Sequence, residues 1–183
     1  MPAQGQKGRL NLVSFDLSLT GTGTVSYSYR TIQSPATLTP PKGLVGVPRL
    51  DWILRQCHSI VPAYSLVIFE DLAFNAHDRN HERAGLATLV RWMLWRKKTP
   101  YILVAPTTLK KFGTGSGKGD KSRIQLEVYK RWHVECADDN QADAYILLRI
   151  GMALMGLDKQ LTKPQLDCLA TIRKSNAAAL DQL

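Results

Sequence analysis

The sequence predicts an α/β fold in which helices flank a mixed β-sheet and continue as a helical C-terminal tail. Residues 10–19 and 65–69 are apolar on both faces, which is typical of strands buried inside a sheet. Residues 82–98 have the apolar spacing of a helix, and a further short strand follows at 101–104. A strand and a hairpin, and then helix, strand, helix and strand, give one α/β layer.

The N-terminal half supplies the first strand, the hairpin and a helix. Residues 20–23 read Thr-Gly-Thr-Gly and turn the chain, and alternate apolar positions over 24–32 complete the hairpin. Residues 34–46 contain prolines and glycines and predict a loop. Apolar residues at helical spacing after Pro48 predict a helix that ends near Ile60.

The C-terminal half predicts helices. A helical turn at 106–112 precedes a glycine-rich loop at 113–119, and Asp120 caps a helix to Trp132. A further helix opens at Asp138 and continues through Leu154, and the tail from Thr162 is helical. No domain boundary precedes this tail. We therefore expect a flexible N-terminus at 1–9, one domain at 10–156 and a helical extension at 157–183.

Composition and charge narrow the class of protein. A chain of 183 residues can bury a substantial core as one domain. Its 24 Lys and Arg residues exceed its 15 Asp and Glu residues, and the net charge of +9 suits a polyanionic partner, nucleic acid first. No CxxC pair occurs, so neither a zinc module nor a disulfide framework is indicated. We expect a cytoplasmic protein, because neither a membrane-spanning segment nor a signal peptide is recognisable.

Acidic residues occupy positions where apolar ones are expected. Asp16 interrupts the first apolar strand, and Glu70 closes the second. Asp139 and Asp143 are four residues apart at the start of a helix, so they share a face with Asn140. A buried carboxylate costs several kcal/mol unless it is paired or holds a cation. Oxygen ligands from two strands and a helix suit Mg²⁺, and two such ions about 3.5–4 Å apart would support phosphodiester hydrolysis.

Each acid also has a structural interpretation when it is taken alone. Asp16 could be hydrogen-bonded to Ser18 or Thr20, and Glu70 could face solvent at a strand end. Asp138 and Asp139 could cap a helix and complement its dipole. The conjunction of these acids favours the metal site over the separate structural roles.

The motifs in chain order carry a family resemblance. They are Asp16-x-Ser18-x-x-Gly21, then Val67-Ile68-Phe69-Glu70, then Asp139-Asn140-Gln141-Ala142-Asp143-Ala144. Together they resemble the RuvC family of Holliday junction resolvases over residues 12–154, and the last motif is most similar to its phage and prophage branch. The resemblance implies an RNase H-like fold, a homodimer, and Mg²⁺- or Mn²⁺-dependent nicking of two opposed strands at a four-way DNA junction. This activity is that of a crossover junction endodeoxyribonuclease.

The resemblance also implies roles for particular residues. By position, Asp16, Glu70 and Asp143 would be metal ligands. The family's fourth ligand falls on Asn140, which offers a carbonyl oxygen without charge, and Asp139 is the alternative that we favour.

Basic residues between the acidic motifs complete the implied site. Lys110 and Lys121 match two spaced lysines of the family, and a lysine beside the scissile phosphate stabilises charge in the transition state. Lys111, Lys118 and Arg123 would hold flanking phosphates, which position DNA without reading its sequence. The alternative for this segment is a solvated basic loop.

Aromatic residues are the remaining candidates for contacts with partners. Phe74 follows Glu70 closely and would stack on an unpaired base at the crossover, as in the resembled family, or else belong to the core. Trp92 and Trp95 on the helix over 82–98 are predicted to be core or dimer interface. A dimer through this helix would place two identical sites on opposed strands of a two-fold symmetric junction.

Other functions can be compared with the same sequence features, which exclude two of them and leave two open. Lys118 precedes Gly119 instead of Ser or Thr, so the loop is not a phosphate-binding P-loop and no nucleotide cofactor is expected. Sugar-kinase and actin-like ATPases need two such domains, which 183 residues do not allow. Two alternatives stay open: an RNase H-like nuclease acting on other branched DNA or RNA–DNA hybrids, and a non-catalytic junction-binding protein.

Overall fold

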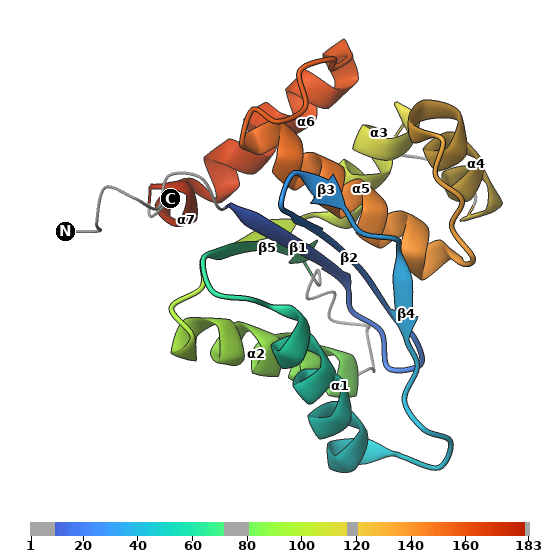
Figure 1. Ribbon diagram of the computed structural model, residues 1–183, viewed down its shortest axis with the longest axis vertical. Coiled ribbons are helices and arrows are strands. Elements are labelled where there is room, and N and C mark those ends of the chain that lie inside the picture. The colour runs from blue at the N-terminus through green and yellow to red at the C-terminus, as the bar shows by residue number, and fades with distance from the viewer. Residues whose placement is uncertain (1–9, 72–80, 117–120, 182–183) are drawn as a thin grey trace.

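The computed structural model describes residues 10–71, 81–116 and 121–181, without the side chains of 121–123. Within these residues a mixed six-stranded sheet lies between two layers of helices (Figure 1). The strands are β1 (Asn11–Asp16), β2 (Thr22–Ser28), β3 (Thr31–Ile32), β4 (Ala36–Leu38), β5 (Ser65–Glu70) and β6 (Tyr101–Val104). The helices are α1 (Gly46–Ile60), α2 (His81–Arg96), α3 (Pro106–Thr114), α4 (Lys121–Trp132), α5 (Asp139–Leu154), α6 (Lys163–Ser175) and α7 (Ala177–Leu180).

Strand β1 is central to the sheet, which has the order β3-β2-β1-β5-β6. β1 pairs with β2 as an antiparallel hairpin, and it pairs with β5 in parallel. β6 continues the sheet parallel to β5, while β3 and β4 both pair antiparallel with β2. The predicted mixed sheet is confirmed.

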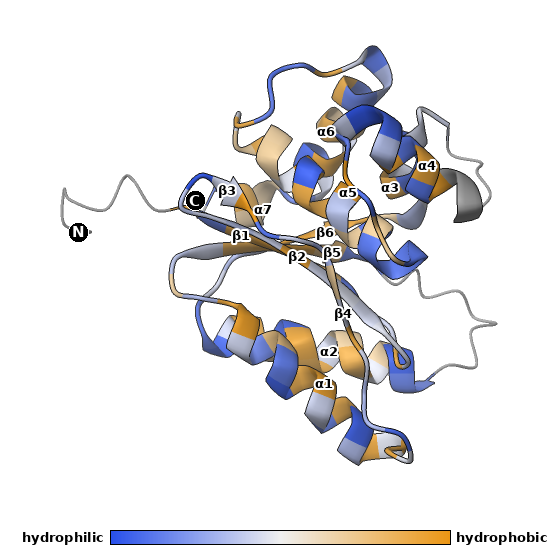
Figure 2. Ribbon diagram, turned by 45° about the vertical axis from the view of Figure 1, so that its right-hand side comes forward, coloured by the Kyte–Doolittle hydropathy of each residue, from blue (hydrophilic) through white to orange (hydrophobic). Residues whose placement is uncertain are grey.

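Helices cover both faces of the sheet, which explains why β1 and β5 are apolar on both faces. Phe15 and Phe69 pack with buried residues of α1 and α2 on one face. Leu12 and Ile68 pack on the other face with buried residues of α5. Figure 2 shows the apolar sides of α1 and α2 turned toward one side of the sheet, with α3 to α6 on the opposite side.

Helix α5 lies directly on β1 and β2. A Cβ atom at Gly23 would lie 2.0 Å from the carbonyl oxygen of Asn140, so only glycine permits this approach. The buried Ser14 hydroxyl donates a hydrogen bond of 2.7 Å to the carbonyl oxygen of Ala144. Close packing and one buried hydrogen bond therefore bring the start of α5 to the end of β1.

Local differences separate the structure from the sequence prediction, among them a predicted strand over 24–32 that is divided into β2 and β3 and an α3 that continues to Thr114 in the predicted loop 113–119. β1 ends at Asp16 instead of Leu19, because the chain turns there and Thr22 Oγ1 donates a 2.9 Å hydrogen bond to the Ser18 carbonyl oxygen. β4 lies within the predicted loop 34–46. Helix α1 begins at Gly46, two residues before Pro48.

The C-terminal helices join the same core. α6 begins with a capping box in which the backbone N–H of Thr162 donates to Gln165 Oε1 at 2.9 Å. Cys168, Leu169 and Ile172 on its inner face are buried with α5 residues. Across the described ranges, none of the helices has the length and apolar character to cross a bilayer. The predicted cap at Asp120 and the predicted flexible segment 1–9 lie outside the described residues.

Candidate functional site

Asp16 and Glu70 are the last residues of two adjacent parallel strands. Phe15 is the register partner of Phe69, so the next residues along the two strands are level with each other. Neighbouring strands are about 4.8 Å apart. Side chains alternate along a strand, and Ser14 points toward α5, so Asp16 and, by the same alternation from Ile68, Glu70 face α5 as well. The carboxyl end of parallel strands is where open α/β sheets place their ligands.

The N-terminal end of α5 is fixed beside these two strand ends. Asp138 is the N-cap, accepting hydrogen bonds from the Gln141 backbone N–H at 2.8 Å and from Thr37 Oγ1 on β4 at 2.6 Å. Asp138 therefore caps the helix, which is the structural role that the sequence suggested for it. Asp143, one turn after Asp139, adjoins Ala144, whose carbonyl is held by Ser14 on β1.

The carboxylates of this region act on one another. Asp16 is only 7% exposed. Burial raises the pKa of Asp16 to about 8, with further increases from the charges of Asp143 and Glu70; Arg83 opposes the shift and Asp139 adds to it. The fold thus brings Asp143, Glu70 and Asp139 within electrostatic range of Asp16.

Glu70 is a second acid with a raised pKa. Burial is the main cause, the charges of Arg83 and Lys110 oppose it, and Asp71 adds to it. Asp71 itself is held by α2, where Arg91 Nη2 donates a 2.9 Å hydrogen bond to its Oδ1. Among the predicted lysines whose side chains the structure describes, Lys110 on α3 is one whose charge acts on Glu70.

The remaining predicted site residues have other surroundings or lack a described side chain. The side-chain nitrogen of Asn140 is 3.5 Å from the position of a Cβ atom at Gly21, so this amide packs against the hairpin. The charge of Lys111 acts on Cys168 of α6, and Lys111 thus lies on the α6 side of α3. Lys121 and Arg123 belong to α4, but their side chains are not described. Phe74 and Lys118 lie outside the described residues.

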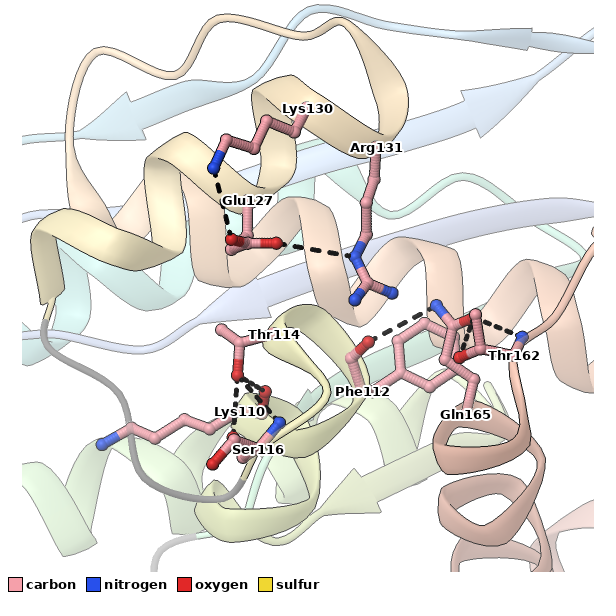
Figure 3. A network of polar contacts seen from close by, with 9 residues as sticks. All are labelled: Lys110, Phe112, Thr114, Ser116, Glu127, Lys130, Arg131, Thr162 and Gln165. Carbon is pink, nitrogen blue, oxygen red and sulfur yellow. Dashed lines mark hydrogen bonds and ion pairs between the residues drawn. The ribbon is translucent and has the colours of Figure 1, made fainter.

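The end of α3 beside Lys110 is fixed by polar contacts (Figure 3). Thr114 Oγ1 lies 2.9 Å from the carbonyl oxygen of Lys110 and 2.7 Å from that of Ser116. Gln165 on α6 donates a 3.4 Å hydrogen bond to the carbonyl oxygen of Phe112. Figure 3 shows the Lys110 side chain extending away from these contacts. The contacts therefore fix the end of α3, and the ammonium group of Lys110 takes no part in them.

The donor set fits a hard divalent cation. The groups that act on Asp16 are three carboxylates and one guanidinium, and oxygen ligands of this kind suit Mg²⁺ or Mn²⁺. In the described part of the chain, no three His, Cys, Asp or Glu side chains are close enough to hold a metal ion as they stand. Mutual repulsion between carboxylates opposes a closer approach, and a cation between them would offset it.

Arg83 is the site residue that sequence reasoning missed. It acts on both Asp16 and Glu70 from the first turn of α2. A signal for it exists in the sequence, because Arg83 precedes Leu86, Ala87 and Val90 by three, four and seven residues. This spacing places it on the same helix face as these buried residues, at the end of that face, where Arg83 is half-buried.

Comparison with known proteins supports the fold. No protein-family model matches the chain, and neither does a curated protein sequence. The chain is similar to the solved structure of Thermus thermophilus RuvC, with a TM-score of 0.62 and 16% identity over 82% of this chain and 99% of that one. For T. thermophilus RuvC in complex with a Holliday junction substrate, the TM-score is 0.60 at 16% identity, covering 83% and 99%. The predicted RNase H-like fold is confirmed, and the phage branch stays a prediction.

We predict that the stability of the protein in chelator falls as the pH rises from about 4 to about 8. The pKa of Asp16 is raised from 3.8 to about 8, so its proton stabilises the fold below its unfolded pKa, and this contribution is lost as the pH passes the folded value. Urea unfolding should show that Asp16→Asn removes several kcal/mol of this pH dependence. Asp51→Asn, at an exposed site on α1, should leave it intact. Parallel pH profiles for the wild type and Asp16→Asn would contradict the assigned cause.

Proposed function

We propose that this protein is a metal-dependent endodeoxyribonuclease that resolves four-way DNA junctions by paired nicks. The observation that carries the proposal is the gathering of Asp16, Glu70 and Asp143 where β1 and β5 end, with the pKa of Asp16 raised first by burial and then by the charges of the other two. A fold similar to that of RuvC supports the same reading.

The acids have a defined role in this proposal. Asp16, Glu70 and Asp143 would hold Mg²⁺ or Mn²⁺, with Asp139 as the fourth ligand. When bound, two such ions supply an activated water and stabilisation of the leaving oxygen. Asp139 is favoured over Asn140 because the charge of Asp139 acts on Asp16, whereas the Asn140 amide packs against Gly21.

The basic residues would bind the DNA backbone. Lys110, whose charge acts on Glu70, would stabilise negative charge that develops on the scissile phosphate. Lys121 would act with it, and Lys111, Lys118 and Arg123 would contact flanking phosphates. The net charge of +9 supports a polyanionic substrate. One similar structure, T. thermophilus RuvC, is described in complex with a Holliday junction substrate.

A homodimer would match the two-fold symmetry of a four-way junction. Trp92 and Trp95 on α2 are 54% and 70% exposed, so of their two predicted roles the core is excluded. Tryptophan is enriched among the residues that dominate interface energies. We therefore assign the outer face of α2 as the interface between two copies of this chain.

Asp16→Asn should reduce junction cleavage by at least about two to three orders of magnitude, the scale of removing one group that stabilises a transition state. Junction binding should be retained or improved, because a negative charge beside phosphate is lost. Cleavage and gel-shift assays with a synthetic four-way junction would measure both effects. Asp51→Asn, which removes an exposed acid from α1, should cleave normally. If Asp16→Asn still cuts DNA at the wild-type rate, the proposed site is wrong.

Replacing Trp92 and Trp95 together by alanine should convert a dimer into a monomer. Each tryptophan at the centre of an interface contributes on the order of 2 kcal/mol or more. Light scattering coupled to size exclusion would measure the mass. Leu166→Ala, at a site on α6 that is 53% exposed, should leave the mass unchanged. A wild-type protein that is monomeric at all concentrations would rule out this interface.

A further inference from the structure

Strand β6 forms one edge of the sheet, and in the described part of the chain β5 is its one strand neighbour. Backbone N–H groups of β5 and of the residue after it donate hydrogen bonds of 3.1 Å to the Pro100 carbonyl oxygen and 2.8 Å to that of Val104. The backbone groups of successive residues point to alternate sides of a strand. Those of Tyr101 and Leu103 therefore point away from β5, toward the outer side of β6.

The side chain of Asn176, between α6 and α7, pairs with this outer side as a neighbouring strand would. The Leu103 backbone N–H donates to Asn176 Oδ1 at 2.9 Å, and Asn176 Nδ2 donates to the Leu103 carbonyl oxygen at 3.0 Å. Two residues that exchange both bonds in this way are the hydrogen-bonded pair of an antiparallel ladder. Among the residues that the structure describes, none pairs in this way with the outward groups of Tyr101. The edge of β6 is therefore able to bind an extended segment beside Tyr101.

A pocket of about 600 Å³, which we call the β6 pocket, lies along this edge. Tyr101 and Leu103 line it from the strand, and Ala178 and Ala179 line it from α7. Trp95 forms part of another wall and belongs to the α2 face assigned above to the dimer, so the pocket adjoins that face. Aromatic and aliphatic side chains thus surround backbone groups that can form hydrogen bonds.

The charge at the β6 pocket is positive. Lys98, at the end of α2, lines the pocket and is exposed, and the described lining contains no Asp or Glu. Two further exposed cations adjoin lining residues in the sequence: Arg96 follows Trp95, and Lys174 precedes Ser175. This charge complements an acidic ligand.

We propose that the β6 pocket is a docking site for an extended acidic peptide segment of a partner protein, which adds to the sheet by pairing with Tyr101. Main-chain hydrogen bonds supply affinity in this mode, and pockets for alternate side chains supply specificity. The apolar walls receive alternate side chains of the peptide, and Lys98 attracts its carboxylates. A DNA strand is also anionic, but its phosphodiester backbone accepts hydrogen bonds and donates none to a carbonyl oxygen such as that of Tyr101. The inference goes beyond the proposed nuclease site and does not depend on it.

Selection from a phage-displayed library of random decapeptides on the full-length protein tests the proposal. The recovered sequences should be enriched in Asp or Glu alternating with aliphatic or aromatic residues, because successive side chains of a strand point to opposite faces. The most frequent of these peptides, made with a fluorescent label, should bind the wild-type protein saturably in an anisotropy titration. Absence of such enrichment over the starting library overturns the proposal.

Two substitutions locate the binding at the β6 pocket. Lys98→Glu should weaken binding of the labelled peptide by at least about tenfold, because attraction becomes repulsion. Ala178→Trp, at an exposed position of α7, should abolish binding by filling the pocket. Lys159→Glu is the matched control, an exposed site outside the lining, and should weaken binding less than about twofold because distant exposed charges are screened. Equal losses in Lys98→Glu and Lys159→Glu would show that net charge alone attracts the peptide, and would overturn the proposal.

Backbone methylation tests whether the peptide adds as a strand. Two versions of the peptide carry N-methyl groups at either the odd or the even positions. The version whose blocked N–H groups face β6 should lose binding, and the other should keep it, because only alternate N–H groups of a strand face one neighbour. Equal effects of the two methylations overturn the proposal. Tighter binding of a ten-residue oligothymidine that Ala178→Trp abolishes would overturn it in favour of single-stranded DNA. None of these measurements uses a metal ion or a junction, so their failure is distinct from failure of the nuclease proposal.

Discussion

The constraint on which the rest of the structure depends is the crowding of negative charge where β1 and β5 end. Asp16 is almost completely buried, and burial together with Asp143 and Glu70 raises its pKa to about 8. Such a cluster opposes folding unless a cation offsets it. The surrounding structure is arranged to hold the acids together against this repulsion: Ser14 holds Ala144 of α5, and Thr37 holds the N-cap Asp138.

This arrangement explains why the sheet and α5 are packed so closely. Gly23 admits the Asn140 backbone, and Gly151 lets the middle of α5 approach Ile68. Each contact removes freedom from α5 relative to β1, and the acids of both elements keep one geometry. Preorganised charge of this kind is what a metal-dependent nuclease requires, because the ligands of its ions must be held in place before the substrate binds.

Much of the fold and of the acidic cluster could be predicted from the sequence, for a physical reason. A carboxylate inside an apolar strand is an anomaly that a pattern exposes, so Asp16 and Glu70 were identifiable before the fold was known. β4 was not predicted, since a three-residue strand between prolines has no periodicity of its own and depends on pairing with β2. The different environments of Lys110 and Lys111 depend on the packing of α3 against α6, and Arg83 reaches acids that are distant in the sequence.

One measurement tests the central claim most directly. The wild-type protein is incubated with a labelled four-way junction, a three-way junction and an RNA–DNA hybrid, over a titration of Mg²⁺ or Mn²⁺, and nicks are mapped on every strand. The account predicts cleavage that requires the divalent ion, prefers the four-way junction, and falls at symmetry-related positions on two opposed strands. Cleavage in chelator, unpaired nicks, or a strong preference for the hybrid would contradict it.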